Sequence, residues 1–390
     1  MNKMLKAQID ASPTISSLLV GRSNNFNLLR LVAALTVFVA HVLLLRQGVG
    51  EKLSLVEQFL GTSASSLAVN AFFVLSGLLV TKSLLRSQSV AEYVIARGLR
   101  LLPGFMVLTL VLTFGIGLTY TVLEPTEYLF SGQTLQYWFF TSLTLSEAGA
   151  LPGLFLSNPV ATIVNGPIWT LKYEVFAYAS ILVLFAFGIL RRKGIFSIFF
   201  CMFLLVSIFA VQTLDIHAAA HTLNGNPLAN LFRFGTCFLF GTLCYVLRDN
   251  MRLNGFAVLV VFGAAYLLRG YHLFEIAAII ALGYAIIWLA LVPSGKVRKF
   301  NQLGDYSYGI YIWHWPIIQT LLVLNPNLSN TALFALALGL TLSAAVASWH
   351  FIERPALNSR HRAVACWRRL SASAGRSKLP IKTHSGHPQR

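Results

Sequence analysis

The residues in this chain best suited to chemistry are ionisable side chains inside long apolar stretches, where each one is costly to bury. The first such stretch reads Asn27-Leu-Leu-Arg30-Leu-Val-Ala-Ala-Leu-Thr-Val-Phe-Val-Ala-His41. Eleven helical positions bring Arg30 and His41 back to nearly the same face, about 16 Å apart along the axis. A neutral imidazole is the usual group for proton transfer near pH 7. The alternatives are an interfacial anchor for Arg30 and an interhelical hydrogen bond for His41.

Two arginines, Arg97 and Arg100, stand just before the third apolar stretch. Their i, i+3 spacing places them on one side of a helical turn, where two guanidinium groups would suit a phosphate-bearing ligand. An ordinary pair of positive charges at the inner membrane surface is the alternative. In the second apolar stretch, Ser76-Gly77 favours close packing of two helices over a direct role.

A carboxylate opens the fourth apolar stretch, in the sequence Trp169-Thr-Leu-Lys172-Tyr-Glu174. Glu174 needs a partner because it lies about one turn inside an apolar helix, and the nearby Lys172 faces away from it. We therefore expect Glu174 to belong to a site. Trp169 is more typical of the aromatic residues that line a membrane interface.

The ninth apolar stretch carries Ser307, Tyr311 and His314 on one face at helical spacing. Such a polar aromatic stripe often belongs to core packing, but a histidine inside the membrane favours a pocket. At the end of the last stretch, Glu353 either pairs with Arg354 or another interfacial arginine, or takes part in function.

The elements that position these residues follow from composition. The chain has 390 residues, of which 56% are hydrophobic and 11% charged, and its mean hydropathy is +0.69. These values exclude a water-soluble domain, a disordered chain and a disulfide-rich secreted module. A membrane-spanning helix needs roughly 17–25 residues. We therefore predict an all-α polytopic membrane protein, a bundle of about ten transmembrane helices at 27–45, 67–85, 101–122, 166–189, 195–214, 228–247, 254–270, 273–292, 305–323 and 331–352.

The charges predict the orientation of the bundle. Lys and Arg number 30 against 13 Asp and Glu, and they concentrate in alternate loops and the tail. The long loop from Glu124 to Asn165 carries three glutamates and no Lys or Arg. The positive-inside rule then places both termini in the cytoplasm, and the net charge of +17 needs no nucleic acid as partner. We expect a cytoplasmic segment 1–25, a membrane domain 26–356 and a basic, disordered cytoplasmic tail 357–390.

Taken together and in this order, the motifs resemble the integral membrane acyltransferase family 3. The resemblance covers residues 24–356 and rests on Arg30 with His41, Phe72-Phe73-Val-Leu-Ser76-Gly77, Arg97-Gly-Leu-Arg100-Leu-Leu-Pro103, Trp169-Thr-Leu-Lys-Tyr-Glu174, Ser307-Tyr308-Gly309-Ile-Tyr311-Ile-Trp313-His314-Trp315-Pro316 and Glu353-Arg354-Pro355. Thr170 stands where this family more often has Ser, and Gly98-Leu99 fill the gap between the two arginines; neither change removes a functional group.

The resemblance implies a bacterial inner-membrane enzyme without a permanently bound cofactor or metal. It would move an acyl group, most often acetyl, from cytoplasmic acyl-CoA to a sugar hydroxyl of a cell-surface or secreted glycan or glycolipid. Our hypothesis is that Arg30, Arg97 and Arg100 bind the phosphates of CoA. His41 would then be the general base or a transient acyl carrier. Glu174 would orient His41 or hold the sugar. Pocket or structural roles remain for Ser76, Trp169, Tyr311, His314 and Glu353.

Two other classes fit ten spans with buried charges. A transporter exporting a small anion or a lipid-linked sugar is one, although the chain has no internal repeat and no paired spans broken by Gly or Pro. A structural subunit of a polysaccharide-assembly complex is the other, but it would not need Arg30 and His41 on one helix face.

Overall fold

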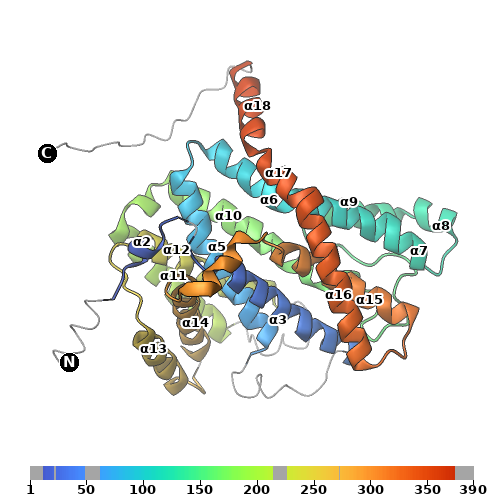
Figure 1. Cartoon of the computed structure of the whole chain (residues 1–390), viewed down its shortest axis with the longest axis horizontal. Helices are drawn as coiled ribbons and strands as arrows, with labels where there is room; N and C mark the ends of the chain where they lie inside the picture. The colour runs from blue at the N-terminus through green and yellow to red at the C-terminus, as the bar shows by residue number, and fades with distance from the viewer. Residues whose placement is uncertain (1–11, 22, 49–61, 214–225, 272, 374–390) are drawn as a thin grey trace.

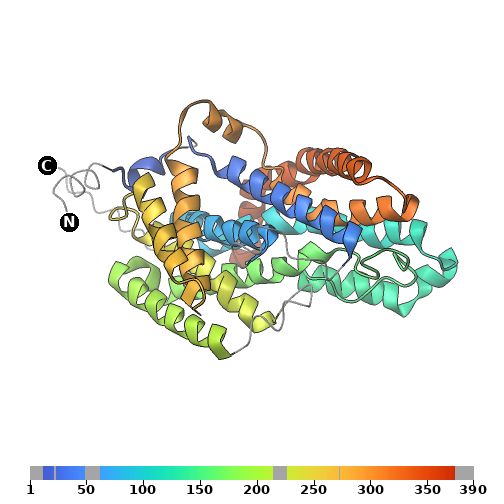
Figure 2. The same ribbon diagram turned by 90° about the horizontal axis from the view of Figure 1, so that it is seen from below.

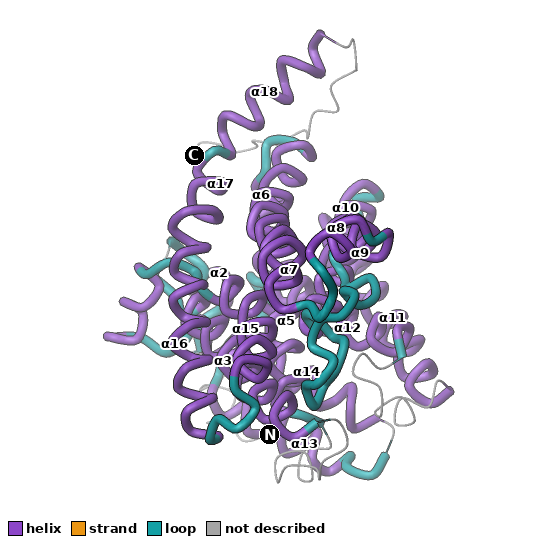
Figure 3. The backbone as a smooth tube through the Cα atoms, turned by 90° about the vertical axis from the view of Figure 1, so that its right-hand side faces the viewer, coloured by secondary structure: helices purple, strands orange, loops and turns teal. Residues whose placement is uncertain are grey.

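The computed structural model describes residues 12–21, 23–48, 62–213, 226–271 and 273–373. Within these segments the chain is helical and forms no strand beyond one isolated bridge, as Figure 3 shows, so the all-α prediction is confirmed. The longer helices are α3 (Phe26–Gln47), α5 (Ala64–Arg86), α6 (Val90–Leu110), α9 (Gly132–Thr144), α10 (Leu171–Ala186), α11 (Lys193–Thr213), α12 (Pro227–Val246), α13 (Gly255–Leu267), α14 (Leu273–Leu291), α15 (Ser307–Leu324), α16 (Asn330–Ser348) and α18 (Arg360–Ser373). Short helices connect several of them: α2 (Ile15–Leu18), α7 (Leu118–Tyr120), α8 (Pro125–Phe130) and α17 (Arg354–Asn358).

Eight of the ten predicted spans are long and apolar enough to cross a membrane, counting only described residues. The other two differ for separate reasons. Helix α13 has 13 residues, which is about 20 Å of helix and shorter than the hydrocarbon core. Helix α15 has 18 residues but carries polar side chains such as His314 and Gln319. These two residues are fully buried, as are most residues of α15, so its polar side chains face other parts of the protein and not lipid.

The third span begins earlier than its hydropathy predicted. Helix α6 starts at Val90, and a π-helical turn (Val111–Gly117) joins it to α7. A capping arrangement sets this start: the Ser89 hydroxyl accepts a hydrogen bond from the Glu92 N–H, and the Glu92 carboxylate accepts one from the Gln88 N–H. Arg97 and Arg100 therefore lie inside the helix, in agreement with the helical turn expected for this pair.

The tightest helix crossing in the bundle joins α5 and α12. A Cβ atom added to Gly77 would lie 1.9 Å from the Phe238 carbonyl oxygen, and one added to Gly241 would lie 2.0 Å from the Val74 oxygen. The backbones thus touch where neither residue has a side chain. This contact agrees with the close packing predicted for Gly77. The two helices run parallel, since the Phe73 ring stacks on Phe234 and Thr81 hydrogen-bonds Thr242 further along.

Helices α3, α15 and α16 pack together on another side of the bundle (Figure 2). Pro316 inside α15 has no N–H to offer the Ile312 carbonyl one turn back. The buried Asn165 amide donates to that carbonyl instead, at 2.9 Å. Asn165 ends a loop that follows α9, so the missing bond in α15 becomes the attachment point of this loop.

The tail differs from our expectation of disorder after residue 356. Residues Arg360–Ser373 form α18, which extends beyond the bundle at the top of Figure 1. Two side-chain contacts hold it to the start of α6, because Arg360 pairs with Glu92 at 2.9 Å and Arg368 donates to Gln88 at 3.2 Å. The remainder of the expected tail, 374–390, lies outside the described residues.

Candidate active site

The structure brings two predicted site histidines into direct contact. Nδ1 of His41 on α3 lies 2.8 Å from Nε2 of His314 on α15. Nδ1 of His314 lies 2.9 Å from the Ile310 carbonyl oxygen in its own helix. The Trp315 ring meets His41 edge-on, with ring centres 5.1 Å apart. His314 is fully buried, whereas His41 keeps some exposure. The interhelical hydrogen bond considered for His41 is therefore present, with a second imidazole as the partner.

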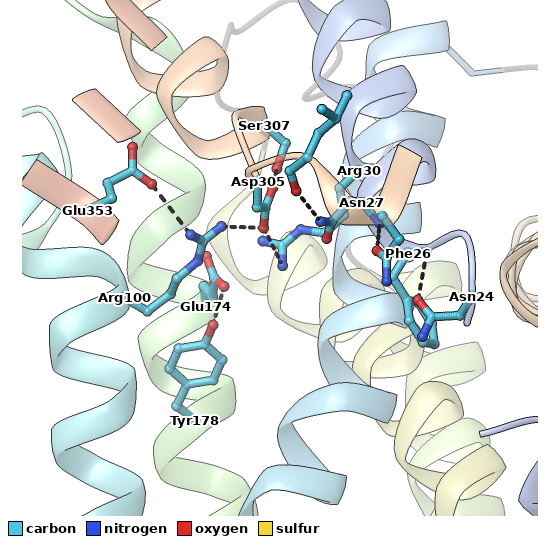
Figure 4. Close-up of polar contacts among 12 residues, drawn as sticks. Asn24, Phe26, Asn27, Arg30, Arg100, Glu174, Tyr178, Asp305, Ser307 and Glu353 are labelled. Atoms are coloured by element: carbon cyan, nitrogen blue, oxygen red, sulfur yellow. Dashed lines mark hydrogen bonds and ion pairs between the residues drawn. The ribbon is translucent and has the colours of Figure 1, made fainter. Parts of the chain in front are cut away.

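A network of buried ion pairs lies at the other end of α3 (Figure 4). Arg100 donates to Asp305 at 2.6 Å and to Glu353 at 3.4 Å, and Arg30 contacts the same Asp305 oxygen at 3.3 Å. Further hydrogen bonds fix the carboxylates, from Ser307 to Asp305 and from Ser348 to Glu353. The network ties together α3, α6, the start of α15 and the end of α16.

This network changes the role expected for one of the arginines. Both arms of Arg100 are bound by carboxylates, and its side chain is only 11% exposed. It is therefore not available to a phosphate group, although its spacing from Arg97 suggested that it would be. Arg97 forms none of the ion pairs found among the described residues and lies over the Tyr178 ring at 5.8 Å. The Nε atoms of Arg97 and Arg30 are buried and have no hydrogen-bond partner there.

Glu174 lies with the arginines and not with His41. Its carboxylate accepts a hydrogen bond from the Tyr178 hydroxyl, one helical turn further along α10. Figure 4 shows it next to Arg100. The partner that it needed inside an apolar helix is thus a tyrosine, and the residue that contacts His41 is His314. The expectation that Glu174 orients His41 does not match this arrangement.

A pocket opens beside the arginine network, and neither His41 nor His314 is among the residues that line it. Its empty space, counting the open mouth, is about 490 Å³. Four helices line it, with the residues Arg30, Val69, Phe72, Phe73, Ser76, Thr170, Leu171, Glu174, Ser307, Tyr308 and Tyr311. The Phe72 and Tyr311 rings meet edge to face at its wall, and the Tyr311 ring centre is 6.3 Å from that of His314. The walls are therefore mainly apolar, with charged groups concentrated around Arg30 and Glu174.

The loop between α9 and α10 packs beside the histidine pair. Trp315 and Gln319 donate to the Ile163 carbonyl at 3.1 Å and 3.0 Å, and Asn158 donates to Gln319. Glu147 in this loop accepts hydrogen bonds from the Val164 and Asn165 N–H groups. Burial raises the pKa of Glu147 to about 7, even though these two donors favour the ionised form.

The remaining predicted residues take mixed positions. Ser76 and Tyr311 line the pocket, and Tyr311 donates to the Pro167 carbonyl at 3.0 Å. Trp169 lies outside the lining and packs on Tyr173 and Phe234. Glu353 pairs with an arginine, as one alternative proposed, but with Arg100 rather than Arg354.

Sequence reasoning gave no role to Asp305, which holds two arginines. Its position at the edge of the ninth apolar stretch was the available signal, because an ionisable residue there is a functional candidate by default. Within the described residues, no three His, Cys, Asp or Glu side chains gather closely enough to hold a metal ion.

The helices and their buried polar site define a multi-pass membrane protein. Residues 23–350 match the sequence model of the acyltransferase domain family, and the chain belongs to that family. It is an acyltransferase, and the family assignment confirms the resemblance drawn from the motifs.

Three curated relatives align along most of their length. Nodulation protein 10 of Rhizobium leguminosarum bv. viciae is 28% identical, over 90% of this chain and 98% of its own. An O-acetyl transferase of Shigella phage Sf6 is 24% identical, over 85% of this chain and 96% of its own. A protein of Komagataeibacter xylinus, described as a membrane-bound transacylase and named BcsY, is 23% identical over 79% of this chain and 80% of its own. No solved structure matches the chain.

Proposed function

We propose that this protein transfers an acyl group, most often acetyl, from cytoplasmic acyl-CoA to a sugar hydroxyl. The acceptor would be a cell-surface or secreted glycan or a glycolipid, and the protein would reside in a bacterial inner membrane with both termini in the cytoplasm. The observation that carries the proposal is the pocket at Arg30, whose wall residue Tyr311 packs against His314. The phage relative is described as an O-acetyl transferase, which supports acetyl as the transferred group.

The arginines give the pocket a polar end for the donor. Arg30 and Arg97 would receive the phosphates of CoA, because both keep a buried Nε without a partner among the described residues. Arg100 would support them indirectly by holding Asp305 and Glu353 in place. The thioester would extend along the apolar wall of Phe72 and Tyr311 toward His41.

His41 would act at the reacting carbonyl by one of two routes. In direct transfer it removes the proton from the acceptor hydroxyl while that oxygen bonds to the thioester carbon. The carbon–sulfur bond then breaks, and the departing thiolate takes the proton from His41 to give free CoA. In the covalent route, an imidazole nitrogen first takes the acyl group and releases CoA, and the hydroxyl then attacks the acyl-imidazole.

The test is acceptor-dependent release of free CoA by purified protein given acetyl-CoA and a sugar acceptor. We expect His41→Ala to lower this release at least about a hundredfold, as loss of a general base does. His361→Ala changes an exposed histidine on α18 and serves as the matched control with normal release. Normal release by His41→Ala would overturn the proposal. Flux of a sugar or anion into liposomes, without any CoA release, would favour the transporter.

Single-turnover labelling distinguishes the two routes. Protein given acetyl-CoA labelled in the acetyl group, without acceptor, retains label only if an acyl-enzyme forms. Label that is retained by the wild type and lost in His41→Ala would support the covalent route. Absence of retained label in an active preparation would support direct transfer.

A further inference from the structure

We propose that His314 is a positioning residue that fixes the tautomer of His41 and leaves its Nε2 as the reacting atom. The inference rests on the proposed function, because it assumes that His41 acts on the acyl group. It assigns to His314 a role that pocket lining or core packing alone would not give it.

The argument begins at a group whose hydrogen-bonding role is fixed. A backbone carbonyl can only accept, so the 2.9 Å contact with Ile310 requires the proton of His314 to be on Nδ1. In the neutral imidazole the other nitrogen, Nε2, then has a lone pair and accepts. The atom facing it at 2.8 Å is Nδ1 of His41, which must therefore carry a proton. Nε2 of His41 is left unprotonated, as a general base or nucleophile requires.

The neutral state of both rings follows from their surroundings. His314 is fully buried, and no carboxylate contacts either imidazole among the described residues. A positive charge placed there would have no opposite charge to offset its loss of hydration. Both rings are therefore neutral in the resting protein, and the assignment of donors and acceptors is unambiguous.

The ring geometry supports a directional hydrogen bond. The planes of His41 and His314 differ by 11°, and their centres are 5.1 Å apart. That separation equals the nitrogen-to-nitrogen distance plus the distances from each nitrogen to its ring centre. The rings therefore lie edge to edge in a nearly common plane, and each lone pair points along the bond instead of meeting a ring face.

Neighbouring side chains hold this alignment. The Phe38 and Tyr311 rings approach His314 edge-on at 6.2 Å and 6.3 Å, and Tyr311 is fixed by its bond to the Pro167 carbonyl. His314 has no exposed surface, whereas His41 keeps some. The accessible reactive nitrogen of the pair is therefore Nε2 of His41.

Two substitutions of similar polarity test the role of His314. Glutamine places an amide oxygen near the position of Nε2 and can still accept from His41, whereas the shorter asparagine reaches only the position of Nδ1. We expect His314→Gln to stay within about tenfold of wild-type turnover and His314→Asn to lose about a thousandfold, as when a catalytic histidine takes the wrong tautomer. The KM for acetyl-CoA should stay unchanged in both. Equal turnover of the two variants in folded protein would overturn the inference.

A second measurement on the wild type decides the matter if either variant fails to fold. Nitrogen NMR of protein labelled with ¹⁵N-histidine distinguishes protonated from unprotonated ring nitrogens, and a His41→Gln sample identifies the His41 signals. We expect a protonated Nδ1 and an unprotonated Nε2 on His41. The opposite tautomer would refute the inference even if His41 proved essential for CoA release. Normal CoA release by His41→Ala would instead refute the proposed function.

Discussion

The substitution Asp305→Asn tests whether the buried ion pairs hold the helix bundle together. One oxygen of Asp305 contacts both Arg100, at 2.6 Å, and Arg30, at 3.3 Å, and the three side chains are 11–21% exposed. Arg30, Arg97 and Arg100 are balanced by Asp305, Glu353 and Glu174. Neutralising one carboxylate leaves an excess positive charge inside the bundle and removes the group that two guanidinium ions share.

The expected cost follows from this burial. Removing one partner of a buried ion pair destabilises a protein by about 3–5 kcal/mol, because the remaining charge is uncompensated. Asp249→Asn is the matched control. Asp249 also pairs at 3.3 Å, with Lys193, but both side chains are about half exposed, at 49% and 48%. An exposed pair of this kind contributes about 0–1 kcal/mol.

Thermal unfolding of the purified protein in detergent, followed by tryptophan fluorescence, provides the comparison. We expect Asp305→Asn to lower the unfolding midpoint by several degrees and Asp249→Asn to leave it nearly unchanged. Adding Arg30→Gln to Asp305→Asn removes one charge of each sign, so the double variant should lose less stability than the sum of the two single variants. Equal midpoints for Asp305→Asn and Asp249→Asn would refute the reasoning.

Three further predictions concern packing, backbone bonding and pH, and all are read from unfolding midpoints in the same detergent. Gly77→Ala should lower the free energy of unfolding by about 3 kcal/mol, because the added methyl group would overlap the α12 backbone. The control Gly339→Ala has open space around it and should be neutral or stabilising, and equal effects of the two variants would contradict the close crossing. Asn165→Ala should cost about 1–3 kcal/mol by leaving the Ile312 carbonyl without its donor, and an unchanged midpoint would contradict that bond. The pKa of Glu147 is about 7 in the folded protein against an ordinary value of 4.5, so the carboxyl group lowers stability as the pH rises between these values. Glu147→Gln should therefore stabilise the protein at pH 8 and have little effect at pH 4. Equal effects at both pH values would contradict the raised pKa.

Hydropathy predicted most of the helices because the membrane imposes a length and an apolar composition on each span. The stretch predicted at 305–323 forms α15, although its buried polar side chains lower its hydropathy below that of the other long helices. Hydropathy misplaced the start of α6, where Ser89 and Glu92 cap a helix that begins in charged sequence. That capping pattern was readable in the sequence.

The site was predictable as a set of residues but not as a set of pairs. Periodicity along one helix placed Arg30 and His41 on one face. The contact between His41 and His314 joins positions 273 residues apart, and the contact between Arg100 and Asp305 joins positions 205 apart. Which helices become neighbours depends on packing such as the Gly77 crossing, which one sequence does not specify. Partners for Glu174, Arg100 and His41 were therefore assigned by chemistry alone, and all three assignments changed.

The ion-pair network also has a consequence for biosynthesis. Arg100 leaves the ribosome 205 residues before Asp305 does, which at about 5–20 residues per second is a delay of roughly 10–40 seconds. During that interval α3 and α6 reach the membrane with arginines whose carboxylate partners have not yet been made. Those pairs form only when α15 and α16 arrive. Carboxylates in the last third of the chain therefore neutralise arginines in the first third, and the helix bundle closes late in translation.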